Sequence, residues 1–252
     1  MTEGEPVDRV AAYRAARARV LDRIARAAAR AGRDPESVTL LAVSKTVHAG
    51  ALRDAVTAGL DQLGENRVQE AATKAPEVPG ARWQLVGPLQ GNKARKAIEL
   101  FESIQSVDSV ALAERLDRLS GEIRPGRRYP ILLQVNVDDD PAKAGFPPAA
   151  LHDAVDRMAG FASLEIRGLM TIGRLVDDPE AARPTFERLR TLSAALHERN
   201  DGTIGPELSM GMTDDFEVAI EEGATIVRVG RALFGERHDH DQAQDDDPVV
   251  AG

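Results

Sequence analysis

The chain has 252 residues, a formal net charge of −9 at pH 7 and no cysteine, which excludes disulfides, iron–sulfur clusters, cysteine-ligated zinc and a cysteine nucleophile. No apolar run approaches the roughly 18 residues of a membrane-spanning helix, and the acidic first eight residues resemble neither a secretory signal nor a transit peptide. We therefore expect a cytoplasmic protein without a membrane partner. The acidic balance of charge also disfavours a nucleic-acid surface, so we expect no nucleic-acid partner.

Residues 9–33 predict an amphipathic helix. Apolar residues recur at a helical period from Val10 through Ile24 to Ala31, with many arginines between them, and Gly32 ends the pattern. An arginine-rich helix could contact an anionic partner. The pattern favours the simpler interpretation, a helix packed on the main body with a solvated face.

From residue 38 onward, short apolar runs alternate with helical patterns. The runs, expected as strands, cover 38–43, 62–63, 83–86, 103–104, 131–135, 164–170, 207–208 and 226–229. The helical patterns cover 48–58, 67–74, 92–100, 109–120, 147–158, 179–200 and 214–221. Eight strand–helix units in about 250 residues predict an α/β fold, a single (β/α)8 TIM-type barrel. An open, doubly wound sheet is the alternative, because the second, fourth and seventh runs are weak.

The predicted barrel domain covers residues 1–237 and includes the helix at 9–33. Residues 238–252 are rich in acidic side chains and predict a disordered tail. His238 and His240 lie in this tail, but two histidines spaced by two are a weak pattern for a metal ligand set. We therefore predict no metal site.

The loops after the strands form the functional end of such a barrel. Lys45 follows an apolar run that ends at Val43, so its ammonium group would lie in the barrel mouth. Desolvation there lowers a lysine pKa and makes the amine a nucleophile for carbonyl groups. On position alone, a lysine paired with a carboxylate at a strand end is an equally good interpretation.

The ends of the last two strands suggest a phosphate site. Barrels often bind phosphate with the loops after strands seven and eight and the start of a short extra helix. Ser209 and Gly211 follow the seventh run, and Gly230 and Arg231 follow the eighth. Glycine lets backbone N–H groups approach an anion, although turn geometry alone could also explain both glycines. With Lys45, this layout suits an aldehyde cofactor that carries a phosphate.

Six stretches resemble, in the right order, the pyridoxal phosphate homeostasis protein family over residues 8 to 237. They are 42–46 (AVSKT), 64–70 (GENRVQE), 83–93 (WQLVGPLQGNK), 168–170 (GLM), 208–215 (LSMGMTDD) and 227–230 (VRVG). The resemblance implies a barrel like the N-terminal domain of alanine racemase that binds pyridoxal 5′-phosphate (PLP). Two positions depart from the family pattern: Gln84 stands where histidine is usual, and Arg231 where threonine or serine is usual.

The resemblance also implies a role for each matched residue. Lys45 looks like the Schiff-base lysine, and Arg228 looks like the partner of the pyridine nitrogen. Ser209, Gly230 and the amide of Arg231 look like phosphate ligands. Asn66 and Met170 look like residues beside the ring.

Arg228 bears on whether the protein is an enzyme. A guanidinium only donates hydrogen bonds, so it keeps the pyridine nitrogen unprotonated and the ring a poor electron sink. The two tyrosines, Tyr13 and Tyr129, are expected at the end of the barrel away from Lys45.

We therefore predict a PLP-binding protein for intracellular PLP homeostasis that is not an enzyme. It would store, buffer or deliver the cofactor, with apo forms of PLP-dependent enzymes as partners, and the resemblance implies a monomer. Two alternatives remain: a small PLP-dependent racemase or lyase, and an interaction protein that uses helix 9–33 or the acidic tail.

Overall fold

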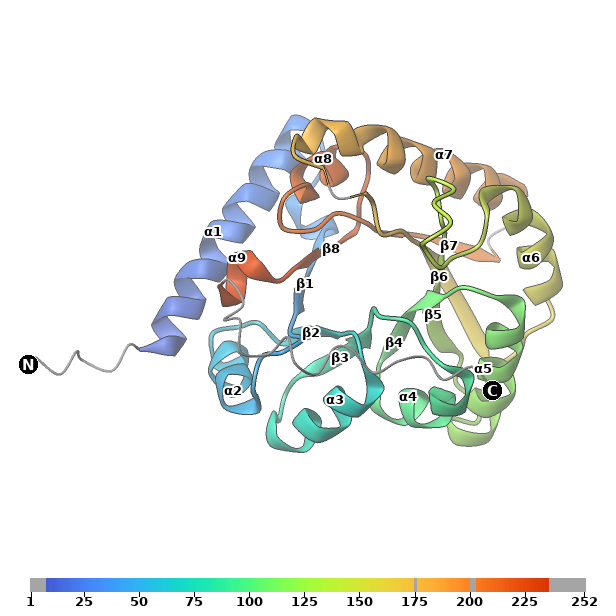
Figure 1. Ribbon diagram of the computed structural model, residues 1–252, viewed down its shortest axis with the longest axis horizontal. Helices are drawn as coiled ribbons and strands as arrows, with labels where there is room; N and C mark the ends of the chain where they lie inside the picture. Colours follow the sequence, from blue (N-terminus) through green and yellow to red (C-terminus); the bar gives the residue numbers. More distant parts are fainter. Residues whose placement is uncertain (1–7, 175, 200–202, 236–252) are drawn as a thin grey trace, which may run out of the picture.

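The computed structural model describes residues 8–174, 176–199 and 203–235. Eight strands pair in chain order, all in parallel, and the last pairs with the first, so the sheet closes into a barrel with helices around it (Figure 1). The predicted (β/α)8 barrel is confirmed, and the open sheet was the wrong alternative. The predicted tail 238–252, with its two histidines, lies outside the described residues.

The strands are β1 (Thr39–Val43), β2 (Gln62–Glu65), β3 (Arg82–Leu85), β4 (Ser103–Val107), β5 (Tyr129–Gln134), β6 (Leu164–Met170), β7 (Ile204–Ser209) and β8 (Ile226–Val229). The helices are α1 (Arg9–Arg30), α2 (Ala49–Thr57), α3 (Val68–Lys74), α4 (Ala94–Leu100), α5 (Val110–Ile123), α6 (Leu151–Met158), α7 (Arg183–Arg199), α8 (Phe216–Glu221) and α9 (Arg231–Phe234). None of the helices in the described ranges has both the length and the apolar character needed to cross a bilayer.

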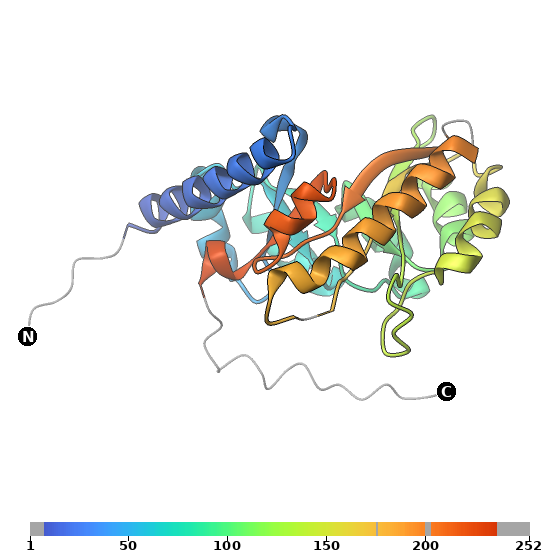
Figure 2. The ribbon, with the colours of Figure 1, turned by 90° about the horizontal axis from the view of Figure 1, so that it is seen from above.

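Helix α1 packs along the outside of the barrel beside α8 and α9 (Figures 1 and 2). It begins where the side chain of Asp8 accepts a hydrogen bond from the Ala11 amide at 3.1 Å. Its buried face includes Val20 and Ile24. On the same helix, Arg23 lies over the Phe216 ring of α8, so part of its positive charge is used inside the molecule.

The barrel interior is filled by side chains. Five apolar residues form a separate cluster there: Leu41, Val86, Leu132, Met170 and Ile226. Arg228 pairs in register with Leu41, so both side chains point to the same face of the sheet, into the barrel. The interior is thus a packed core with a few buried polar groups.

Three strands are longer than the predicted apolar runs by two or more residues. The structure extends β2 to Glu65, β4 to Val107 and β7 back to Ile204. Buried polar residues account for much of the difference, since Glu65 and Gln105 are fully buried yet look like loop residues in the sequence. Residues 231–234, treated as loop, form the short helix α9.

Candidate functional site

Lys45 lies in the turn that follows β1, at the carboxyl end of the barrel, and its side chain is half-buried. Because β1 pairs with both β8 and β2, the loops that follow those strands flank this turn. The approach to β8 is close: a Cβ atom on Gly230 would lie 3.4 Å from the Val43 carbonyl oxygen. The structure thus brings Lys45 beside one of the glycines predicted to bind phosphate.

Arg228 lies in β8 with only 5% of its surface exposed. Its two terminal nitrogens donate hydrogen bonds of 2.7 Å to the Ser209 hydroxyl and to the Thr171 carbonyl oxygen. Burial lowers the pKa of Arg228 to about 10, while the Asp215 carboxylate acts in the opposite direction. At neutral pH the guanidinium therefore stays protonated and can only donate.

The side chains of two predicted phosphate ligands, Ser209 and Arg231, point in different directions. The Ser209 hydroxyl donates to Gln105 Oε1 at 2.6 Å and accepts from Arg228, so this side chain points into the barrel interior. The guanidinium of Arg231 pairs with Asp214, and both side chains are about half exposed. For Arg231 this geometry leaves the backbone amide, at the first turn of α9, as the group available to an anion.

Asn66 and Met170, predicted beside the cofactor ring, lie at two depths. Met170 ends β6 and is completely buried in the interior cluster with Val86. Asn66 follows β2, and the loop after β3 packs directly on its backbone: a Cβ on Gly87 would lie 2.3 Å from the Asn66 carbonyl oxygen. Glycine at 87 therefore allows the two loops to meet.

A cavity of about 310 Å³ opens at the same end of the barrel, between the loops after β3, β5 and β6. Its lining includes Val86, Gln134 and Lys143. Lys143 Nζ donates to the Ile172 carbonyl oxygen at 3.2 Å, and 24% of its side chain is exposed. A second lysine thus stands at the carboxyl end, in a loop some distance along the chain from Lys45.

A buried charge cluster, which was not predicted from the sequence, lies beneath the turn of Lys45. Lys74, from α3, donates to Glu65 Oε1 at 2.9 Å, to the Ser44 carbonyl oxygen at 3.0 Å, and to Glu70. The Ser44 hydroxyl also donates to Glu65 Oε1 at 2.7 Å. Burial raises the pKa of Glu65, and the Lys74 charge opposes that shift. We call these three charged residues the Glu65–Glu70–Lys74 cluster.

The cluster fixes the backbone on both sides of Lys45. It holds Ser44 through the contacts above, and Glu70 Oε1 accepts a 2.8 Å hydrogen bond from the Thr46 amide. Thr46 has φ of +66°, a strained conformation for a β-branched residue. The only signal in the sequence was the spacing of Glu70 and Lys74, one helical turn apart, which does not reveal burial.

The two tyrosines separate. Tyr129 begins β5, is buried, and donates to the Phe101 carbonyl oxygen at 3.0 Å, so its predicted place at the amino end is confirmed. Tyr13 packs edge-on against Phe234 of α9, with ring centroids 5.7 Å apart. Because α9 follows the carboxyl end of β8, the prediction for Tyr13 was wrong: α1 runs antiparallel to β1, which places its first turns near that end.

Comparison with known proteins agrees with this geometry. Residues 17–238 match the model of the alanine racemase N-terminal domain. The chain is 44% identical over 224 residues to a pyridoxal phosphate homeostasis protein of Pseudomonas aeruginosa, covering 87% of this chain and 94% of the relative. A protein of the same name from Escherichia coli K12 is 40% identical over 229 residues, with the same two coverages.

Solved structures give the same result. PipY of Synechococcus elongatus, solved with PLP bound, has a TM-score of 0.74 and 45% identity, covering 84% of this chain and 100% of PipY. Alanine racemase of Clostridium difficile, at 14% identity, a TM-score of 0.66 and coverages of 89% and 62%, shares the fold alone. The chain therefore belongs to the alanine racemase N-terminal domain family and, within it, to the pyridoxal phosphate homeostasis proteins.

Proposed function

We propose that this protein binds PLP at the carboxyl end of its barrel and serves PLP homeostasis by storing, buffering or delivering the cofactor. The observation that carries the proposal is the position of Lys45, in a turn fixed from both sides, next to Gly230 and in the same mouth as the buried cation Arg228. PLP supplies an aldehyde, which condenses reversibly with an amine, and a phosphate.

Each predicted residue then has a task. Lys45 Nζ attaches the cofactor covalently, and Arg228 donates to the pyridine nitrogen. Gly230 and the Arg231 amide receive the phosphate. Ser209 joins them when its hydroxyl exchanges a present partner, Gln105 or Arg228, for the anion. The two residues proposed to border the ring are Asn66 and Met170.

Turnover of amino acids is not part of the proposed function. A protonated, electron-withdrawing pyridine ring favours transaminase-type chemistry at the Cα atom of an amino acid, and Arg228 is a donor that cannot share a proton with that nitrogen. Proton transfer at Cα on an unprotonated ring would need a strong acid–base partner facing Lys45. Tyr129 is buried at the opposite end, and Tyr13 lies between α1 and α9. We propose a monomer that acts in the cytoplasm on PLP and on apo forms of PLP-dependent enzymes, without nucleic-acid or membrane partners.

The proposed delivery role predicts that the PLP-loaded protein activates a PLP-free transaminase. The expected result is activation above a control in which free PLP is trapped, because the attachment exchanges with any incoming amine. Alanine incubated with the loaded protein in deuterium oxide should meanwhile show negligible exchange of its Cα hydrogen. Activation no greater than the control would overturn the delivery role, and efficient exchange would instead establish a racemase or lyase.

Replacing Arg228 with glutamine should weaken PLP binding by about 10- to 100-fold, the range expected for one hydrogen bond from a charged donor. Covalent attachment should persist, because Lys45 and the phosphate site remain. Titration followed by visible absorbance measures the affinity, and circular dichroism checks the fold. Unchanged or tighter binding would contradict the role of Arg228.

A further inference from the structure

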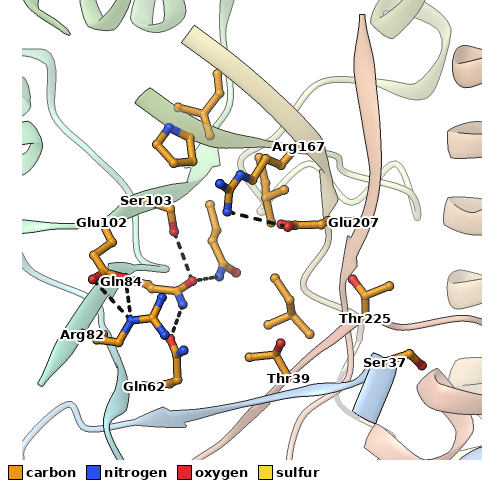
Figure 3. Close-up of a pocket in the computed structure, with 15 residues that line it drawn as sticks. Ser37, Thr39, Gln62, Arg82, Gln84, Glu102, Ser103, Arg167, Glu207 and Thr225 are labelled. Carbon is orange, nitrogen blue, oxygen red and sulfur yellow. Dashed lines mark hydrogen bonds and ion pairs between the residues drawn. The ribbon is translucent and has the colours of Figure 1, made fainter. Parts of the chain in front are cut away.

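A second cavity, of about 450 Å³, opens at the amino end of the barrel, opposite Lys45 (Figure 3). Its position follows from its lining, which includes the first residues of four consecutive strands: Thr39, Gln62, Arg82 and Ser103. The amino end of a barrel ordinarily serves stability, and no sequence pattern predicted a site there. This volume falls within the roughly 300–1,000 Å³ of small-molecule sites.

A line of hydrogen bonds connects this cavity to the carboxyl end. Arg228 donates to the Ser209 hydroxyl at 2.7 Å, and Ser209 donates to Gln105 Oε1 at 2.6 Å. Gln105 Nε2 then donates to Gln84 Oε1 at 2.7 Å. Gln84 Nε2 donates in turn to Gln62 Oε1 at 3.0 Å. We call this series the Arg228–Gln62 chain, and its last three members line the cavity.

The Arg228–Gln62 chain has one direction. A guanidinium can only donate hydrogen bonds, so the Ser209 hydroxyl accepts one from Arg228 and donates its own hydrogen to Gln105. Each amide must then turn its oxygen toward the previous member and its NH₂ group toward the next. The chain therefore ends with the NH₂ group of Gln62 at the cavity, a donor that suits an acceptor such as a carboxylate.

The opposite wall carries separated charges. Arg167 Nη1 lies 3.9 Å from Glu207 Oε1, too far for a direct hydrogen bond, and Figure 3 shows the two side chains facing each other. Among the described residues, neither oxygen of Glu207 accepts a hydrogen bond. Burial raises the pKa of this carboxyl group, and the charge of Arg167 opposes that shift. At the rim, Arg82 pairs with Glu102 at 3.0 Å. Arg167 Nε also donates to Glu165 Oε2 at 3.2 Å, which leaves its two terminal nitrogens to a ligand. Among the residues that line the cavity, two guanidinium groups balance two carboxylates, which suits a ligand without net charge.

We propose that the amino-end cavity is a second ligand site, for a zwitterion of amino-acid size, coupled to the carboxyl end through the Arg228–Gln62 chain. The ligand's carboxylate is received by Arg167 and the Gln62 amide, and its ammonium by Glu207. Binding at this cavity is independent of the proposed PLP function; only the coupling rests on it.

L-proline is the probe, because a secondary amine forms no stable neutral imine with an aldehyde and so does not compete at Lys45. Cyclopentanecarboxylate and pyrrolidine keep the five-membered ring but lack one of the two charges each. Calorimetric titration of the full-length protein, with and without PLP, should show proline binding at least about tenfold tighter than either analogue. Equal binding of the three probes, or no binding of proline, would overturn the site.

A charge-removing variant locates the site. Glu207→Gln should weaken proline binding by about tenfold or more and leave cyclopentanecarboxylate unaffected, because only the ammonium loses its partner. Glu99→Gln makes the same charge change on the exposed face of α4 and should alter neither. If Glu207→Gln leaves proline binding unchanged, the cavity is not where proline binds.

The coupling has its own measurement. Saturating proline should change the affinity for PLP, and PLP should change the affinity for proline by the same factor, as linkage requires. Gln105→Leu breaks the Arg228–Gln62 chain and should abolish the effect while proline still binds; Gln84→Leu repeats the test one link away. Proline binding with no change in PLP affinity would disprove the coupling.

Discussion

Lys45→Ala is expected to abolish covalent attachment of PLP. The substitution removes the lysine that belongs to the turn after β1, between the loops of β2 and β8. The fold should survive, because Lys45 is half-buried in a turn and contributes no side chain to the hydrophobic core. Arg228 and the backbone of α9 remain, so weak non-covalent binding of PLP should persist.

Borohydride reduction tests this expectation directly. Reduction of the loaded wild-type protein should fix the pyridoxyl group on the peptide that contains Lys45, and the same treatment of Lys45→Ala should fix none. Lys93→Ala and Lys143→Ala are matched controls, since both lysines follow strands at the same end of the barrel. Label found mainly on Lys93 or Lys143 in the wild type would show that the wrong lysine has been assigned.

Lys74→Met is expected to destabilise the protein by about 3–5 kcal/mol, the usual cost of removing one partner from a buried ion pair. Only 10% of the Lys74 side chain is exposed, and without it the carboxylates of Glu65 and Glu70 lose their shared cation. Lys96→Met is the control: that lysine is 58% exposed and lies 3.5 Å from Glu99. An exposed pair contributes about 0–1 kcal/mol, so the free energy of unfolding should barely change.

The deficit of Lys74→Met should also grow with pH. Burial raises the folded-state pKa of Glu65 above its unfolded value, so between the two values the folded state binds more protons. Stability therefore falls as pH rises through that window. Loss of the opposing Lys74 charge raises this pKa further and widens the window. Urea unfolding of the wild type and of Lys74→Met at pH 5 and pH 8 measures the difference in their free energies of unfolding. An equal difference at both pH values would show that Glu65 does not titrate as described.

Much of the fold could be predicted from the sequence, because strand–helix alternation directly reflects a barrel. Strand ends were less predictable wherever a buried polar residue interrupts an apolar run, as Gln105 does in β4. Lys45 and Gly230 were predicted at the ends of the first and eighth strands, and closure of the barrel makes these two strand ends adjacent.

Side-chain directions within the site could not be predicted. The burial of Lys74 depends on how α3 packs against β2, and the pairing of Arg231 with Asp214 depends on two loops joined only in three dimensions. The cavity at the amino end was also invisible, because Gln62, Gln84 and Gln105 are separated in sequence and meet only when the barrel closes.

Gln84 gives the barrel interior a property that a histidine at this position would remove. An imidazole changes its charge between about pH 5 and 8, and its protonation decides whether a ring nitrogen donates or accepts. In this chain, Gln84 links Gln105 to Gln62 through an amide that neither gains nor loses a proton. The orientation of the hydrogen bonds across the barrel is therefore insensitive to the acidity of the surroundings.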